Sequence, residues 1–163
     1  MQPRTWKISI PVRPKAVQSV RSGGRHFHAD PKVIKWKNEI RPHIEKACMG
    51  LPPSKLPIRV VALRYYYHLP KTAKKKVIEH IKAGGVVPYL APADITDNLN
   101  KGVIDVCKGI VFEDDAQIWL INGEITKQYA LEDRIELEFE ETPGVMLIDG
   151  ITAGEQSNEV SHD

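Results

Sequence analysis

The sequence predicts an α+β fold, in which one mixed β-sheet of about four strands has helices packed against it. Two patterns carry this prediction. Four segments alternate between apolar and polar residues or are rich in β-branched and aromatic ones, as strands are: residues 5–12, 58–68, 116–125 and 134–141. Three others, 31–49, 71–83 and 95–110, have the composition or the apolar spacing of helices. A chain of 163 residues fits one domain with a substantial core.

The first strand is expected to bury one side, formed by alternate residues: Trp6, Ile8, Ile10 and Val12. The segment from Pro11 to Asp30 that follows has almost no apolar content and several arginines, so we expect a basic loop there.

The first helix has a clear start signal in Asp30-Pro31. The aspartate can accept the first free amide hydrogens, and the proline has no amide hydrogen to lose. Gly50 is expected to close the helix, and Pro42 is expected to kink or split it.

The second half of the chain continues the alternation of strands and helices. Gly84-Gly85 ends a short basic helix, and Asn122-Gly123 is expected to form a turn or bulge within the third strand segment. Residues 134–141 alternate cleanly, with Ile135, Leu137 and Phe139 facing inward. Beyond residue 142 the chain is mostly polar and aperiodic, and we expect a flexible tail over 143–163.

Composition excludes several classes of protein. No apolar run approaches the roughly 18 residues that span a membrane, and the N-terminus has no signal-peptide pattern. Cys48 and Cys107 lie far apart among apolar neighbours, which favours free thiols over a disulfide. These features predict a cytoplasmic protein.

Charge is divided unevenly along the chain. Residues 1–90 hold 19 Lys or Arg against 4 Asp or Glu, a net +15, whereas residues 91–163 hold 4 against 17, a net −13. This asymmetry suggests a basic surface for a polyanion beside a separate acidic function, although two solvated faces of opposite sign would also produce it.

The acidic function is sought first on the helix expected over 95–110. A helical wheel places Asp94, Asp97, Asn98, Lys101 and Asp105 on one face and the apolar residues on the other. Asp94 as an N-cap, Asp97 in the first turn and a Lys101–Asp105 ion pair would explain this face without chemistry, so this helix alone leaves structure and function equally supported.

Asp114-Asp115 favours function. Two adjacent carboxylates at the expected start of a strand repel each other and would gain nothing from the backbone. A divalent cation such as Mg²⁺, which prefers carboxylate oxygens, would explain them, and we expect them to lie beside the start of the acidic helix.

These residues together resemble the RusA family of Holliday junction resolvases. That family has an Asp-x-Asp-Asn-Leu-x-Lys element followed by Asp-Asp-x-Gln; here the matching residues are Asp97, Asn98, Leu99, Lys101, Asp114, Asp115 and Gln117. The similarity extends over about residues 6–140. The family's upstream aspartate would fall at position 95, which is isoleucine here, and the nearest carboxylate is Asp94.

The resemblance implies a RusA-like endonuclease domain over residues 1–142 that acts as a homodimer and resolves four-way DNA junctions with Mg²⁺. The implied metal ligands are Asp97 and Asp115, with Asp94 and Asp114 completing or orienting the site. Lys101 would assist cleavage, with Asn98 positioning a ligand. No membrane association and no small-molecule cofactor are expected.

The basic half would supply affinity for the DNA backbone. The expected phosphate contacts are Arg13, Lys15, Arg21, Arg25, Lys74, Lys75 and Lys76. Two alternatives stay open: a non-catalytic protein that binds branched DNA, and a metal-dependent nuclease that prefers another branched substrate.

Overall fold

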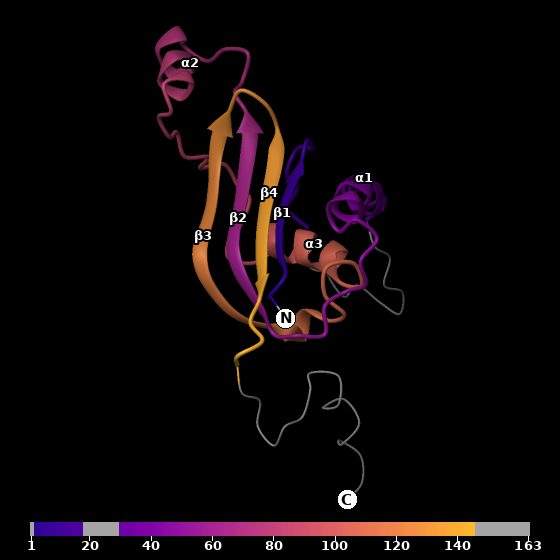
Figure 1. Cartoon of the computed structure of the whole chain (residues 1–163). Helices are drawn as coiled ribbons and strands as arrows, with labels where there is room; N and C mark the ends of the chain where they lie inside the picture. The colour runs from indigo at the N-terminus through magenta and orange to yellow at the C-terminus, as the bar shows by residue number, and fades with distance from the viewer. Residues whose placement is uncertain (1, 18–29, 146–163) are drawn as a thin grey trace, which may run out of the picture.

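The computed structural model describes residues 2–17 and 30–145. One four-stranded sheet has the strand order β1-β4-β2-β3, with β2 and β3 parallel and the other neighbours antiparallel. Three helices accompany it (Figure 1). The elements are β1 (Thr5–Ile10), α1 (Pro31–Ala47), β2 (Ile58–His68), α2 (Lys75–Lys82), α3 (Asn98–Cys107), a short 3₁₀ helix η1 (Asp115–Gln117), β3 (Ile118–Ala130) and β4 (Arg134–Glu141). The expected α+β fold with one mixed sheet is confirmed.

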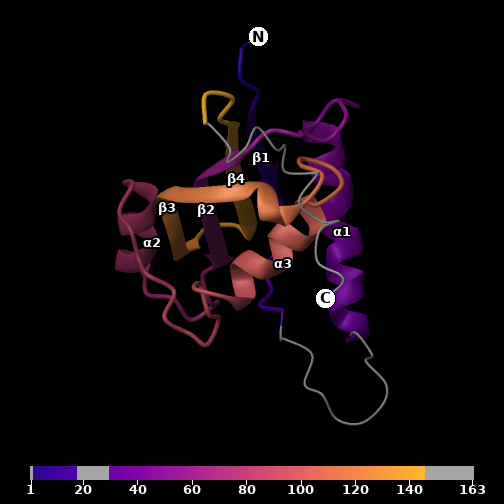
Figure 2. The same ribbon diagram turned by 90° about the horizontal axis from the view of Figure 1, so that it is seen from below.

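The core lies between one face of the sheet and the helices α1 and α3, which lie on the same side of it (Figures 1 and 2). Alternation in β1 and β4 turns every second side chain inward, as the sequence predicted. The helices contribute their apolar stripes to the same cluster, with Ile40 and Ile44 from α1 and Leu99 and Val103 from α3 fully or almost fully buried. This packing fixes α3, and with it the acidic residues at its two ends.

The start of α1 agrees with the sequence, but its interior does not. Asp30 is the N-cap, and its side chain accepts the Lys32 amide hydrogen at 2.8 Å, with Pro31 as the first helical residue. Pro42 was predicted to kink or split this helix. It does not split the helix, because α1 continues without interruption to Ala47. Pro42 and Asn38, whose carbonyl would otherwise accept a hydrogen bond from residue 42, are both exposed, so water can replace that bond.

Two of the predicted segments have different bounds. The helix expected over 71–83 begins only at Lys75, and the strand expected over 116–125 is instead β3, which extends to Ala130. Residues 115–117 belong to η1, because Asp114 caps a 3₁₀ turn there. The tail expected over 143–163 falls mostly outside the described residues.

The predicted bulge at Asn122-Gly123 is confirmed. The pairing of β2 with β3 shifts register between Val60–Ile121 and Ala62–Glu124, so residues 122 and 123 are both accommodated opposite Val61. A Cβ atom on Gly123 would lie 1.6 Å from the Val61 carbonyl oxygen, which belongs to the backbone and cannot rotate away.

Substitution Gly123→Ala is therefore expected to lower the free energy of unfolding by about 3 kcal/mol, since the two strands must separate locally to admit the methyl group. Urea denaturation measures this change. The exposed neighbour provides a matched control, because Asn122→Ala should change stability by no more than about 0.5 kcal/mol. An unchanged midpoint for Gly123→Ala would contradict the close approach of the two backbones.

Candidate active site

The N-terminus of α3 presents Asp97 in an unusual way. Asp97 is the N-cap residue of the helix, yet its side chain makes no capping hydrogen bond. The neighbouring Asn98 amide, with its nitrogen facing the available acceptors, donates to Asp97 Oδ2 at 3.3 Å and to the Val17 carbonyl at 3.1 Å. The Asp97 carboxylate is thus held by a side chain and left free of the usual capping role.

Asp94 does not belong to the helix, and the predicted helix start was wrong. The chain forms a turn at residues 94–96, in which the Thr96 amide and hydroxyl donate to Asp94 Oδ1 at 2.8 and 2.6 Å. These hydrogen bonds, first that of the hydroxyl, lower the pKa of the Asp94 carboxyl. The helical wheel that placed Asp94 beside Asp97 therefore does not apply to it. Asp94 and Asn98 nevertheless line one open hollow, together with Lys127.

Lys101 lies in the first turn of α3, where its amide donates to the Asp97 carbonyl at 2.9 Å. Its side chain is exposed. The suggested Lys101–Asp105 ion pair is not formed, because Asp105 pairs instead with Lys37 of α1 at 2.9 Å. Within residues 2–17 and 30–145, Lys101 makes no ion pair, so its charge is available beside Asp97.

Asp114 and Asp115 lie at the start of η1 rather than at the edge of a strand. The statement that they gain nothing from the backbone was wrong for Asp114. Its side chain accepts the Ala116 amide hydrogen at 2.9 Å, and its own amide hydrogen is accepted by Gln117 Oε1 at 2.7 Å. Together these bonds form a capping box.

Both carboxylates also contact Lys108, which follows the last residue of α3. Its Nζ atom lies 2.6 Å from Asp114 Oδ2 and 3.1 Å from Asp115 Oδ1. The hydrogen bond from Lys108, followed by the one from the Ala116 amide, lowers the pKa of Asp114 to about 2. Asp114 therefore remains charged at neutral pH, and both carboxylates contact one shared cation.

The two acidic groups lie beside opposite ends of α3. Asp97 precedes its first residue and Lys108 follows its last, and a helix of ten residues is about 15 Å long. Among the residues that the structure describes, no group of three or more His, Cys, Asp or Glu is close enough to hold a metal ion. The expected meeting of Asp114 and Asp115 with the start of the acidic helix is not found within one chain.

The donor chemistry still fits a hard divalent cation. The convergence of Asp114 and Asp115 on one ammonium group shows that both carboxylates can reach a single cation. Carboxylate oxygens are the ligands that Mg²⁺ prefers. Asp97 adds a carboxylate that its helix does not use.

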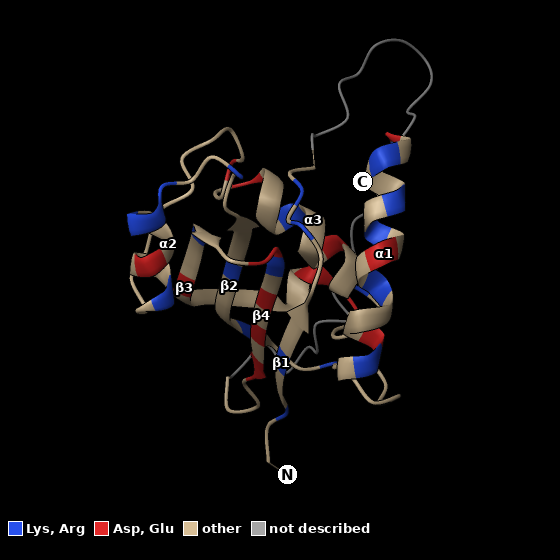
Figure 3. Cartoon of the chain, turned by 90° about the horizontal axis from the view of Figure 1, so that it is seen from above, with Lys and Arg blue, Asp and Glu red and all other residues tan. Residues whose placement is uncertain are grey.

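Five of the seven predicted phosphate contacts are among the described residues, and they lie in two places. Arg13 pairs with Asp133 at 3.0 Å and lies over the Tyr67 ring, and Lys15 is half-buried beside it. Arg21 and Arg25 lie outside the described residues. Lys74, Lys75 and Lys76 are exposed at the start of α2, which buries none of its side chains and lies apart from α1 and α3 (Figure 3).

Sequence reasoning missed two parts of this region. Lys108 was not assigned a role, although it falls near Asp97 and Lys101 on the helical wheel. The buried Glu141 was also missed, and here a signal existed. Glu141 continues the inward positions of β4 after Ile135, Leu137 and Phe139, and a carboxylate at an inward position requires a partner.

Exposed carboxylates that can hold a divalent metal, an exposed lysine and a separate basic helix are what a phosphodiester-cleaving nuclease requires. The model of one such family, endodeoxyribonuclease RusA, matches residues 10–140. The chain therefore belongs to the RusA endodeoxyribonuclease family. A comparison with individual curated proteins finds no match. None of the helices in the described parts of the chain is long and apolar enough to cross a membrane.

Proposed function

We propose that this chain is a magnesium-dependent endodeoxyribonuclease that resolves four-way DNA junctions by paired nicks, in homologous recombination and repair. The observation that carries the proposal is the pair of acidic groups at the ends of α3, in a chain whose residues 10–140 match the RusA family. The free, buried thiols of Cys48 and Cys107 support a cytoplasmic location.

The metal would be held by Asp97 and Asp115, with Asp94 and Asp114 completing or orienting the site. Bound magnesium would polarise a phosphoryl oxygen and lower the pKa of a bound water. Asp114 is already ionised at neutral pH in contact with Lys108, so no proton has to leave its carboxyl before a cation binds. Lys108 must move away from the two carboxylates when the metal binds.

Lys101 and Asn98 have separate roles in this proposal. Lys101 brings a fixed positive charge within one helical turn of Asp97, where it can stabilise negative charge that develops at phosphorus. Asn98 orients the Asp97 carboxylate. It also donates to the Val17 carbonyl, which holds the segment after β1 beside the start of α3. The Asn98 amide would contact the metal ligand Asp97 and not the metal itself.

A homodimer would overcome the separation of the two acidic groups. We propose that Asp97 of one protomer works with Asp115 of its partner, since about 15 Å of helix lies between the Asp97 and Lys108 ends of α3 in one chain. Two-fold symmetry then produces two equivalent sites, which suits nicks on opposed strands of a four-way junction.

The test of this function is cleavage of a synthetic four-way junction by the purified chain. We expect paired nicks with Mg²⁺, no nicks with EDTA, and little cleavage of a linear duplex. Binding without cleavage in any divalent metal would instead favour a branched-DNA-binding protein. Equal cleavage of flaps or forks would indicate a nuclease with another substrate preference.

The role of α2 in DNA binding is tested by the triple substitution of Lys74, Lys75 and Lys76 by Gln. The slope of log K against log salt should fall by about 0.9 for each phosphate that a lysine no longer neutralises, so the triple variant should show a slope smaller by about 2 to 3. Fluorescence anisotropy with a labelled junction at several salt concentrations measures this slope.

A neighbouring substitution of opposite charge is the control. Glu79→Gln removes an exposed acid from the same helix and should leave junction affinity unchanged or increase it. A triple lysine variant with the parental slope would show that α2 does not contact phosphates.

A further inference from the structure

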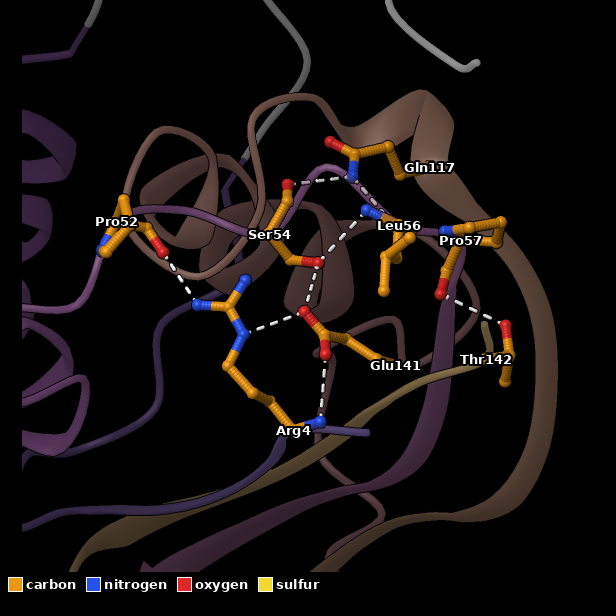
Figure 4. A network of polar contacts seen from close by, with 8 residues as sticks. All are labelled: Arg4, Pro52, Ser54, Leu56, Pro57, Gln117, Glu141 and Thr142. Carbon is orange, nitrogen blue, oxygen red and sulfur yellow. Dashed lines mark hydrogen bonds and ion pairs between the residues drawn. The ribbon is translucent and has the colours of Figure 1, made fainter. Parts of the chain in front are cut away.

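A polar network connects Gln117, which follows the Asp114–Asp115 turn, with Ser54, Glu141 and Arg4 (Figure 4). It begins at Gln117, which is 4% exposed. Its Oε1 accepts the Asp114 amide hydrogen at 2.7 Å, and its Nε2 donates to the carbonyls of Ser54 and Leu56 at 2.9 and 2.8 Å. The Gln117 amide therefore fixes the turn against the segment that contains Ser54.

Ser54 connects Gln117 to the carboxylate of Glu141. It is fully buried, and its hydroxyl donates to Glu141 Oε1 at 2.6 Å. Its backbone is bound to the chain just before the two aspartates, with the Ser54 amide donating to the Val111 carbonyl at 2.9 Å and the Glu113 amide donating to the Ser54 carbonyl at 3.1 Å. Ser54 thus holds residues 111–113, which lead to the turn, through two backbone hydrogen bonds.

Glu141 is held in turn by Arg4. The Arg4 amide donates to Oε2 at 2.8 Å, its guanidinium Nε donates to Oε1 at 2.7 Å, and a further guanidinium nitrogen donates to the Pro52 carbonyl at 2.8 Å. Burial raises the pKa of the Glu141 carboxyl, but the hydrogen bonds from Ser54 and Arg4 and the arginine charge lower it further than burial raises it. The carboxylate is therefore ionised and fully partnered.

Stability alone is a poor explanation of this pair, because the desolvation of the two charges consumes much of their attraction. The hydrogen bonds of the network connect Arg4, through Glu141, Ser54 and Gln117, to the backbone amide of Asp114. The network therefore ends at the turn that carries the two aspartates, which a role in stability alone would not require. Arg4 and Glu141 also lie just outside residues 10–140, the part of the chain that matches the family model.

We propose that Arg4, Ser54, Glu141 and Gln117 are positioning residues that hold the Asp114–Asp115 turn in the conformation that binds the divalent metal. They contact neither metal nor DNA. They act by fixing the Asp114 amide and the chain leading to it, so that both carboxylates converge on one cation, as they now do on Lys108. This inference rests on the proposed function, because it assigns the turn to the metal site.

The test measures metal binding as well as cleavage. Gln117→Met keeps the length of the side chain and removes all three hydrogen bonds. We expect the Mn²⁺ concentration that half-saturates the junction-bound protein, followed by loss of the free Mn²⁺ signal in electron paramagnetic resonance, to rise about 10- to 100-fold. The Mg²⁺ concentration for half-maximal cleavage should rise in parallel, and junction affinity measured in EDTA should not change.

Two variants with smaller changes test the same inference if Gln117→Met does not fold. Ser54→Ala removes the hydroxyl that donates to Glu141 and accepts from the Leu56 amide. It leaves the Arg4–Glu141 pair and the backbone carbonyl that accepts from Gln117, so we expect a smaller rise in the same direction. Glu141→Gln keeps the shape and one acceptor oxygen, and should restore most of the affinity that Glu141→Ala loses.

A matched core substitution separates positioning from stability. Ile10→Val, at a fully buried site in β1, should destabilise the fold by about 1 kcal/mol and leave metal half-saturation unchanged. If Gln117→Met and Ser54→Ala lower the melting temperature but bind metal like Ile10→Val, the network is only structural and the inference is overturned. A wild-type chain that neither binds metal nor cleaves would instead overturn the proposed function itself.

Discussion

Asp97→Asn and Asp115→Asn are each expected to abolish junction cleavage while the protein still binds the junction. Each substitution removes one negative oxygen from the proposed metal site and leaves the size of the side chain unchanged. Loss of the metal's contribution amounts to several kcal/mol of transition-state stabilisation, which corresponds to a rate lower by about a thousand-fold. Single-turnover cleavage with Mg²⁺ measures this loss, and anisotropy measures binding.

The control for these variants is a carboxylate next to the same turn. Glu113 is exposed and pairs with Lys55 at 3.6 Å, so Glu113→Gln should cleave at close to the parental rate. Cleavage at the parental rate by either aspartate variant would remove that residue from the site. Loss of junction binding would indicate that the charge change disturbs the DNA surface and not only the metal.

A mixture of the two inactive variants is expected to regain activity. In a heterodimer of Asp97→Asn and Asp115→Asn protomers, one shared site carries both substitutions and the other carries neither. If each site combines Asp97 of one protomer with Asp115 of its partner, nicking returns from undetectable to a substantial fraction of the parental rate. Because only one site is intact, the product should be single nicks without paired resolution.

The contrary result is equally clear. If both aspartates of a site came from the same chain, every site of the heterodimer would carry one substitution and the mixture would remain inactive. Co-expression with two different affinity tags isolates the heterodimer, and each homodimer purified in the same way is the control. An inactive heterodimer that binds the junction normally would place both aspartates of each site in one protomer.

Much of the fold could be predicted because its signals are local. The alternation in 134–141 yields β4 with the same bounds, and Asp30-Pro31 marks the start of α1, since a strand face and a helix cap depend on neighbouring residues alone. The bulge at Gly123 was recognised for the same reason. The bounds of β3 were not, because its second half is stabilised by pairing with β2, which is distant in sequence.

The candidate site was less accessible to prediction from sequence. The wheel assumed that the helix includes residue 94, but the Asp94–Thr96 turn competes with the helix and delays its start to Asn98. Asp114 was judged to gain nothing from the backbone, because the capping box requires Gln117 in a geometry that no periodicity reveals. Contacts such as Lys37–Asp105 depend on how α1 packs against α3.

The most direct test of the central claim uses a four-way junction labelled on each of its four strands in turn. With Mg²⁺, the purified chain is predicted to nick two opposed strands at symmetric positions and to release two nicked duplexes, whereas a linear duplex made from the same arms stays largely intact. With EDTA in place of Mg²⁺, binding should persist without nicks. A chain that binds the junction but leaves all four strands intact in Mg²⁺ and Mn²⁺ would contradict the assignment of a metal-dependent resolvase.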